Sequence, residues 1–322
     1  MKAAVVASAE AATPEYGDFA EPRVGDGYEL VELVASGLHQ IVRSLAAGRH
    51  YGSTQAWPLV PGVDVVARTA GGDLIYTGLV SPPYGTFAER MAVPKKFRVP
   101  LPTGADPVKI AGGMNPGLAS WLPLKARVRE IGSLGSVLVL GATGMTGYLA
   151  VQHARLLGAD RIVGVGRNAA RLARLAPLGA VTVALSGNRE ADAAAIIDAL
   201  GGTTPSTVLD FLWGSPAETV FASFERHGLE EDAADIAYTQ IGSVAGANAA
   251  VPAALLRSRR IRITGSGAGS AQIAEIMAEV PVYMKHIADG NVDVPTRTVP
   301  LSSISDGWAA PADGAYRVVV VP

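Results

Sequence analysis

The sequence predicts an α/β protein in which a doubly wound parallel sheet follows a domain of antiparallel or barrel-like β structure. From about residue 118 onward, apolar runs of strand length alternate with helical patterns, which is the rhythm of a parallel sheet. These runs are apolar throughout, as expected for strands that helices cover on both faces. Before residue 118, short strands are separated by proline and glycine, which indicates tight turns.

The first part of the chain contains one clear strand and one helix. Residues 28–35 alternate as a half-buried strand does, with Glu29 and Glu32 set among apolar positions. Residues 38–47 are predicted to be helical. The turn residues that punctuate this part are Pro58, Pro61, Gly62, Gly71, Gly72, Pro82, Pro83, Pro94, Pro100 and Pro102.

The second part of the chain is predicted to alternate regularly between strand and helix. The predicted strands are residues 136–140, 161–165, 181–185, 207–211, 237–243 and 260–265. The predicted helices are residues 146–157, 169–178 and 191–200. A last β run, residues 317–321 (RVVVV), is expected to return to the first domain.

The composition excludes several classes of protein. The 322 residues are 49% hydrophobic and 17% charged, so the chain can bury a large core and is not intrinsically disordered. Its 27 Lys and Arg residues nearly balance 29 Asp and Glu residues, which argues against a nucleic-acid partner. Cysteine is absent from the sequence, which excludes disulfides, thiolate nucleophiles, cysteine-ligated zinc and iron–sulfur clusters.

The sequence contains no targeting or membrane signal that we recognise. The first nine residues are too short an apolar run for a signal peptide, and Glu10 follows them directly. No apolar stretch reaches the 18 residues that a transmembrane helix needs. We therefore expect a cytoplasmic protein without a membrane partner.

A glycine-rich turn between a buried strand and a helix is the strongest motif. Residues 139–147 read VLGATGMTG, with glycines spaced as in a variant of the dinucleotide-binding fingerprint of the Rossmann fold. Gly141 permits the tight turn, Gly144 lets the backbone approach a pyrophosphate, and Gly147 lets the helix pack on the strand. The N–H groups at the helix start attract phosphate. The turn residues predicted to contact the cofactor are Gly141, Thr143, Gly144, Met145 and Thr146.

The end of the second strand of this domain favours NADPH over NADH. NAD sites usually place an acidic residue there to accept the ribose 2′-hydroxyl. Here Gly166 stands in that place, and we expect it to leave room for a 2′-phosphate that Arg167 binds. Asn168 is predicted to lie at the same site, and Arg171, one helical turn further, could add a second positive charge.

Several short motifs resemble a known family in their order and spacing. They are ASGLHQ at residues 35–40, PGVDVVA at 61–67, YGTFAE at 84–89, MNPGLA at 114–119, Ile241-Gly242, and Thr264-Gly265-Ser266. Together they resemble the medium-chain dehydrogenase/reductase superfamily, and within it the zinc-independent quinone oxidoreductase branch that includes zeta-crystallin. The resemblance covers nearly the whole chain.

The resemblance implies a GroES-like catalytic domain made of residues 1–118 and 263–322, with a Rossmann domain over residues 119–262 between them. It implies hydride transfer from NADPH and a homodimer, in which an apolar strand such as residues 260–264 could pair across a two-fold axis. Leu38 and Val63 stand about where zinc-dependent relatives carry a cysteine and a histidine. The resemblance also adds cofactor-binding positions, which are Asn115, Leu212, Trp213, Ile241, Gly242, Gly265 and Ser266.

The sequence departs from the family at several positions of the substrate end. His39 replaces a common asparagine, and Val42 replaces an acidic residue. Leu118 stands for a threonine, and Leu185 stands for a tyrosine on the adenine side. We therefore expect the cofactor fold to be retained and the substrate end to be rebuilt.

Two residues are candidates for the catalytic proton donor. Tyr51 resembles a loop tyrosine of related enoyl-thioester reductases, and a phenol can donate to a developing enolate oxygen. His39 could bind the cofactor or protonate the substrate, because its pKa lies near the working pH. Passive lining of a cleft is the alternative for Tyr51, and a hydrogen-bonded structural role is the alternative for His39. His153 is expected to lie on the surface, and Asp210 could cap a neighbouring turn.

The sequence therefore predicts an NADPH-dependent, zinc-free oxidoreductase that reduces an apolar quinone or an α,β-unsaturated carbonyl. Two alternatives remain. An enoyl-thioester reductase would need a basic patch, which Arg43 and Arg49 could supply. A non-catalytic NADPH-binding redox sensor would bind the cofactor and turn over no acceptor.

Overall fold

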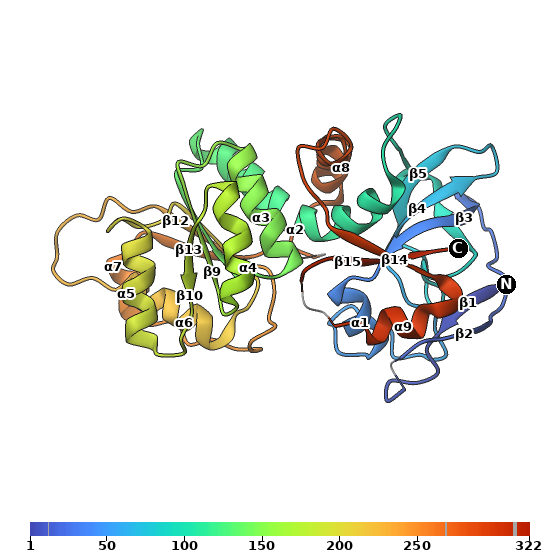
Figure 1. Ribbon diagram of the computed structural model, residues 1–322, viewed down its shortest axis with the longest axis horizontal. Coiled ribbons are helices and arrows are strands. Elements are labelled where there is room, and N and C mark those ends of the chain that lie inside the picture. The colour runs from blue at the N-terminus through green and yellow to red at the C-terminus, as the bar shows by residue number, and fades with distance from the viewer. Residues whose placement is uncertain (12, 268, 312–313) are drawn as a thin grey trace. The chain divides into compact units, whose positions relative to one another are not determined.

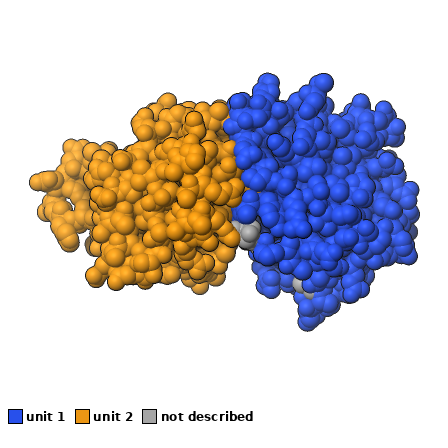
Figure 2. All heavy atoms as spheres, in the orientation of Figure 1, with its two compact units in different colours: residues 1–116, 277–322 blue, residues 117–276 orange. Residues whose placement is uncertain are grey.

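The computed structural model describes residues 1–11, 13–267, 269–311 and 314–322. The chain forms two compact units (Figure 2): unit 1 is Met1–Pro116 with Met277–Pro322, and unit 2 is Gly117–Ile276. The first boundary between the units, at Pro116, lies close to the predicted residue 118. The return to unit 1 comes later than the predicted residue 263, so that the last strand of the parallel sheet stays whole within unit 2.

Unit 1 is built on a mainly antiparallel sheet (Figure 1), with strand order β14-β15-β3-β4-β5-β7 and β6 also paired to β3. The pairing of β15 with β3 joins the two ends of the chain, as expected for residues 317–321. A separate pair is formed by β1 and β2. The strands are β1 (Lys2–Val5), β2 (Glu15–Asp18), β3 (Tyr28–Gly37), β4 (Asp64–Thr69), β5 (Leu74–Gly78), β6 (Arg90–Pro94), β7 (Val99–Pro100), β14 (Thr296–Pro300) and β15 (Arg317–Val321).

Helices and an apolar core complete unit 1. Its core packs Val31, Val65 and Phe87 from the strands and the segments between them against Val42 of α1 and Trp308 of α9. The long helix α2 (Pro107–Ile131) begins in unit 1 and ends in unit 2, because the boundary in the sequence lies between Pro116 and Gly117. The helices are α1 (Gln40–Ala46), α2 (Pro107–Ile131), α8 (Ile273–Ala288) and α9 (Ile304–Ala309).

Unit 2 is a six-stranded, all-parallel sheet with the order β10-β9-β8-β11-β12-β13. Counted within this unit the order is 3-2-1-4-5-6, which is the arrangement of doubly wound dinucleotide-binding domains. Ligands of such sheets bind beyond the carboxyl ends of the strands, where the strand order reverses. The strands are β8 (Ser136–Leu140), β9 (Arg161–Gly166), β10 (Val181–Ala184), β11 (Thr207–Asp210), β12 (Ile236–Gln240) and β13 (Ile261–Gly265).

Helices cover both faces of the central strands β8, β9 and β11, which explains why these strands are largely apolar and buried. Alternate residues of one strand enter different cores: Leu138 and Leu140 contribute to one cluster, and Val137 and Val139 to the other. The helices of unit 2 are α3 (Met145–Leu156), α4 (Ala169–Leu172), α5 (Arg189–Ala199), α6 (Gly214–Ser223) and α7 (Ala253–Ser258). No helix in the described ranges combines the length and the apolar composition that a bilayer crossing requires.

One helix is shorter than predicted. A helix was expected over residues 169–178, but α4 ends at Leu172 and Ala173–Leu178 forms a 3-10 turn. Pro177 lies inside that turn, and proline has no N–H to donate and disfavours helical geometry in the residue before it.

Candidate cofactor site and a buried polar cluster

The glycine turn lies between β8 and α3, where the sequence places it. Gly141 has a φ of +93°, a left-handed conformation that favours glycine. A Cβ on Gly147 would lie 2.6 Å from the Cα of Ala142, so the helix can pack this closely only with glycine. A Cβ on Gly144 would meet only the carbonyl oxygen of Gly141, at 3.6 Å, so among the described residues the space in front of Gly144 is open.

This turn fits a pyrophosphate. Gly144 is the N-cap of the twelve-residue helix α3, and no side chain in the described part of the chain caps the helix start. The first-turn N–H groups, including those of Met145 and Thr146, carry the positive end of the helix dipole. A phosphate in front of Gly144 would receive these N–H groups without meeting a side chain. The backbone here thus provides both the space and the donors that a dinucleotide needs.

The reason for glycine at position 166 differs from the predicted one. A Cβ on Gly166 would lie 2.6 Å from Cγ2 of Thr143, so the room beside Gly166 is already filled by the glycine turn. Glycine is required here for packing, and it does not by itself leave space for a 2′-phosphate. Arg167 is exposed directly after β9. Asn168 has a structural contact as well, because its side chain accepts the N–H of Arg171 at 3.0 Å and caps α4.

Asp210, at the end of β11, organises two loops at the carboxyl edge of the sheet. Its Oδ1 accepts the N–H groups of Leu212 and Trp213 at 2.8 and 2.9 Å. Its backbone oxygen accepts the N–H groups of Ile241 and Gly242, which follow β12, at 2.7 and 3.1 Å. The capping of a neighbouring turn that the sequence suggested is therefore present, and it extends to a second loop.

The Asp210 side chain is fully buried, and a tyrosine completes its hydrogen bonding. The hydroxyl of Tyr238 on β12 donates to Oδ2 at 2.6 Å. Burial raises the pKa of Asp210, and the bonds from Tyr238, Trp213 and Leu212 oppose that rise. Burial, together with the neighbouring carboxylate, raises the pKa of Tyr238 well above its usual value. The tyrosine therefore remains a hydrogen-bond donor at neutral pH.

The remaining predicted cofactor residues of unit 2 also follow the ends of strands. A Cβ on Gly242 would lie 2.5 Å from the carbonyl oxygen of Phe211, so the two loops touch backbone to backbone. The N–H of Ser266, just after Gly265 and the end of β13, donates to the carbonyl oxygen of Gln240 at 2.8 Å. Asn115 belongs to unit 1 and lies partly buried on α2.

In unit 1, His39 lies in a buried polar cluster. The side chain is 2% exposed, and its Nε2 lies 3.1 Å from Oδ1 of Asp64. The other carboxylate oxygen of Asp64 accepts the hydroxyl of Tyr76 at 2.9 Å. Burial lowers the pKa of His39 although Asp64 opposes the change, so the imidazole is neutral at pH 7. Arg317, whose pKa burial lowers to about 10, donates to the carbonyl oxygen of Leu38 at 3.0 Å.

Tyr51 lies in a very different environment from His39. The side chain is 76% exposed on the segment between α1 and β4. Its ring stacks on His50, with 4.0 Å between the ring centroids. Nδ1 of His50 accepts the N–H of Gly52 at 3.0 Å, which fixes the local turn. The phenol is therefore accessible to a ligand, whereas the imidazole of His39 is enclosed by protein.

The structure corrects the prediction for His153. This residue was expected on the surface of its helix, but it is fully buried. Its Nδ1 lies 2.9 Å from the hydroxyl of Ser120, and its ring meets Trp121 edge to face. Both partners belong to α2, which covers the side of α3 that a single helix pattern would assign to solvent.

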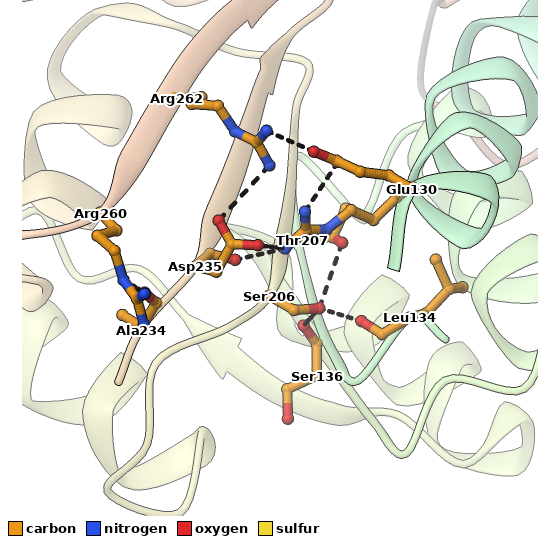
Figure 3. A network of polar contacts seen from close by, with 10 residues as sticks. Glu130, Leu134, Ser136, Ser206, Thr207, Ala234, Asp235, Arg260 and Arg262 are labelled. Carbon is orange, nitrogen blue, oxygen red and sulfur yellow. Dashed lines mark hydrogen bonds and ion pairs between the residues drawn. The ribbon is translucent and has the colours of Figure 1, made fainter. Parts of the chain in front are cut away.

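A network of ion pairs lies elsewhere in unit 2 and was not predicted (Figure 3). Arg127 of α2, which is 2% exposed, donates to Glu130 at 2.9 Å and to Oδ2 of Asp235 at 3.0 Å. Arg262 on β13 pairs with the same two carboxylates. The network therefore ties α2 to the loop before β12 and to the edge strand. Sequence spacing carries no signal for it, because its members come from three separate segments.

Comparison with known proteins supports this description. No family model matches the sequence. The chain is 28% identical to the probable NADPH-dependent quinone reductase tdiC of Emericella nidulans, over an alignment of 363 residues that covers all of both proteins. The predicted resemblance to the quinone oxidoreductases is thereby confirmed over the full length.

Solved structures share the fold. A probable oxidoreductase from Mycobacterium abscessus is 24% identical, with a TM-score of 0.78, and the match covers 100% of this chain and 99% of that one. The quinone oxidoreductase of Thermus thermophilus, also solved in complex with NADPH, is 23% identical with a TM-score of 0.78 and full coverage of both chains. The predicted fold class, a Rossmann domain with a GroES-like domain, is confirmed.

Proposed function

We propose that this chain, which has the two-domain fold of the medium-chain dehydrogenases/reductases, is an NADPH-dependent oxidoreductase that reduces a quinone or an α,β-unsaturated carbonyl without zinc. The observation that carries this proposal is the open, uncapped glycine turn at the carboxyl edge of a sheet ordered 3-2-1-4-5-6. The relative tdiC, which matches over the full length, bears the name of a probable NADPH-dependent quinone reductase.

The residues of unit 2 would bind the cofactor. The N–H groups of the first turn of α3 receive the pyrophosphate in front of Gly144. The exposed guanidinium of Arg167 binds the 2′-phosphate, since no acidic residue follows β9 to select a 2′-hydroxyl. NADPH supplies a hydride from its nicotinamide, which is the chemistry that reduction of a quinone or an enone needs.

The residues of unit 1 would supply the proton and bind the substrate. The accessible phenol of Tyr51 donates the proton or a hydrogen bond to the substrate oxygen. His39, whose Nε2 lies 3.1 Å from Oδ1 of Asp64, is the second candidate. Among the described residues, no three His, Asp or Glu side chains are grouped as metal ligands. The chain pairs as a homodimer through β13, whose one sheet neighbour in the described ranges is β12 and which exposes Arg262 and Thr264.

Turnover of NADPH against a panel of acceptors tests the proposal. The acceptors are a benzoquinone, a naphthoquinone, a simple enone and a crotonyl thioester, each also assayed with NADH. We expect the quinones or the enone to be reduced, with NADPH preferred. An Arg167→Ala variant should lose that preference, and an Arg174→Ala variant, which removes the same charge from the 3-10 helix Ala173–Leu178, serves as the control.

Other outcomes of these assays would indicate other functions. Turnover of the thioester alone would indicate an enoyl-thioester reductase. Tight NADPH binding without turnover of any acceptor would indicate a redox sensor. A Tyr51→Phe variant with the wild-type rate would remove Tyr51 as the proton donor.

A further inference from the structure

Four of the residues predicted to bind the cofactor donate their backbone N–H groups to a single residue, Asp210. Two of them bond to its side chain and two to its backbone oxygen. Leu212 and Trp213 donate to Oδ1 of Asp210, and Ile241 and Gly242 donate to its backbone oxygen. Asp210 itself faces away from solvent and is 0% exposed. It therefore acts on any ligand at this edge only through the loops that it holds.

The loop after β11 has a backbone that needs such a restraint. Trp213 has φ and ψ of 56° and −163°, a left-handed conformation that a bulky residue rarely adopts. Gly214 follows with a φ of +62°, and a Cβ there would lie 2.9 Å from the carbonyl oxygen of Ala245. On the other side, the carbonyl oxygen of Leu212 accepts the N–H of Ala245 at 2.9 Å. Strain of this kind is concentrated at ligand-binding and catalytic sites.

A carboxylate suits this position better than an amide. The side chain of Asp210 offers only acceptors, and the two N–H groups and one hydroxyl that approach it are all satisfied. An asparagine of the same shape would keep its oxygen for the two N–H groups only by turning its NH2 group toward Tyr238, whose hydroxyl would then accept instead of donate. Because the hydroxyl of Tyr238 donates to Oδ2, Oδ1 remains to accept the N–H groups of Leu212 and Trp213 in the loop after β11.

We propose that Asp210 is a positioning residue for NADPH, and that with Tyr238 it holds residues 211–214 and 241–242 in the conformation that receives the cofactor. This inference rests on the proposed function, because it assumes that NADPH binds at this edge of the sheet. It gives a role to a buried carboxylate that is 0% exposed and acts through the two loops that it holds.

The test compares Asp210→Asn and Tyr238→Phe with a matched control, Tyr283→Phe. Tyr283 is also a fully buried tyrosine, and its hydroxyl donates to the carbonyl oxygen of Gly113 in unit 1 at 3.3 Å. NADPH affinity is measured by calorimetry on the full chain, and amide hydrogen exchange is measured for residues 211–214. Steady-state kinetics give the KM of NADPH and the KM of the quinone separately.

We expect the dissociation constant of NADPH to rise about tenfold in Asp210→Asn, which corresponds to about 1.4 kcal/mol. Tyr238→Phe should show a smaller rise, and both should exchange amides 211–214 faster than the wild type. The KM of NADPH should follow, with the KM of the quinone unchanged. Tyr283→Phe should leave NADPH affinity and amide exchange in this loop as in the wild type.

Two results would overturn the inference while leaving the proposed function intact. One is wild-type NADPH affinity in a folded Tyr238→Phe variant and, where it folds, in Asp210→Asn. The other is an equal loss of affinity in Tyr283→Phe, which would indicate general destabilisation. If the wild type binds no NADPH, the proposed function fails, and the positioning role fails with it.

Discussion

Each unit of the molecule contains a buried aspartate bound by a tyrosine on the neighbouring strand, and the two pairs differ in how completely their polar atoms are satisfied. In unit 1, Tyr76 of β5 donates to Asp64 of β4. In unit 2, Tyr238 of β12 donates to Asp210 of β11. Both tyrosines lie two residues before the residue that is in register with the aspartate, which places each pair on one face of its sheet.

The second oxygen of each carboxylate shows the difference. Oδ1 of Asp210 accepts two backbone N–H groups, whereas Oδ1 of Asp64 lies 3.1 Å from Nε2 of His39 without the angles of a hydrogen bond. Within the described residues, both ring nitrogens of His39 lack a partner of good geometry. A satisfied buried carboxylate stabilises the backbone around it. We infer that the pair in unit 2 is a scaffold for the loops at the carboxyl edge of its sheet.

The largest expected effect is on stability, and it separates the two pairs. Asp210→Ala leaves two N–H groups and a tyrosine hydroxyl without acceptors, so we expect a loss of about 3–5 kcal/mol in the free energy of unfolding. Asp64→Ala leaves one hydroxyl without its acceptor, so we expect a loss of about 1–2 kcal/mol. Denaturant unfolding of the full chain, followed by circular dichroism, measures both. Equal losses in the free energy of unfolding would show that the two carboxylates stabilise the fold to the same extent.

The sequence was sufficient to predict the elements that repeat regularly. Apolar strands and intervening helical patterns predicted the doubly wound sheet, and the glycine turn at residues 141–147 predicted a candidate cofactor site at its edge. These signals are local, because each depends on residues within one turn of helix or one strand. The apolar run at residues 317–321 is also a local signal, so it could be recognised as a strand. Its pairing with β3 could not be predicted, because β3 lies far away in the sequence.

Contacts between distant segments could not be predicted from these patterns. His153 is buried because α2 covers it, and a helix pattern records only one preferred face. Gly166 is required by Thr143, which is more than twenty residues away in the sequence. The second loop held by Asp210 belongs to the segment after β12, and spacing along the chain carries no sign of that bond.

The pH dependence of stability should sharpen the comparison, because the two pairs respond in opposite directions. Burial lowers the pKa of His39 from 6.5, so the unfolded chain binds the proton more readily. Its contribution is therefore present above about pH 6.5 and is lost as the pH falls below that value. Burial raises the pKa of Asp210 from 3.8, so its contribution is greatest in acid and is lost as the pH rises through the raised value.

Unfolding of the wild type, His39→Leu and Asp210→Asn between pH 4 and pH 8 measures these slopes. The difference in stability between the wild type and His39→Leu should fall as the pH drops below about 6.5. The difference between the wild type and Asp210→Asn should change in the opposite sense at lower pH. Parallel curves for the wild type and His39→Leu would mean that the buried imidazole titrates as it does in the unfolded chain.

The smallest expected effect concerns the ion-pair network of Figure 3, which shows what a polar network contributes when solvent reaches it. Glu130 accepts from Arg127 and Arg262, but its side chain is 41% exposed. Arg127 keeps Asp235 as a partner when Glu130 is changed, so no buried charge is left unpaired. We expect Glu130→Gln to lower the free energy of unfolding by less than about 1 kcal/mol, and by less still in high salt. Unfolding at low and high ionic strength tests this. A loss as large as that of Asp64→Ala would mean that the charge network, and not burial of unsatisfied groups, distinguishes the two units.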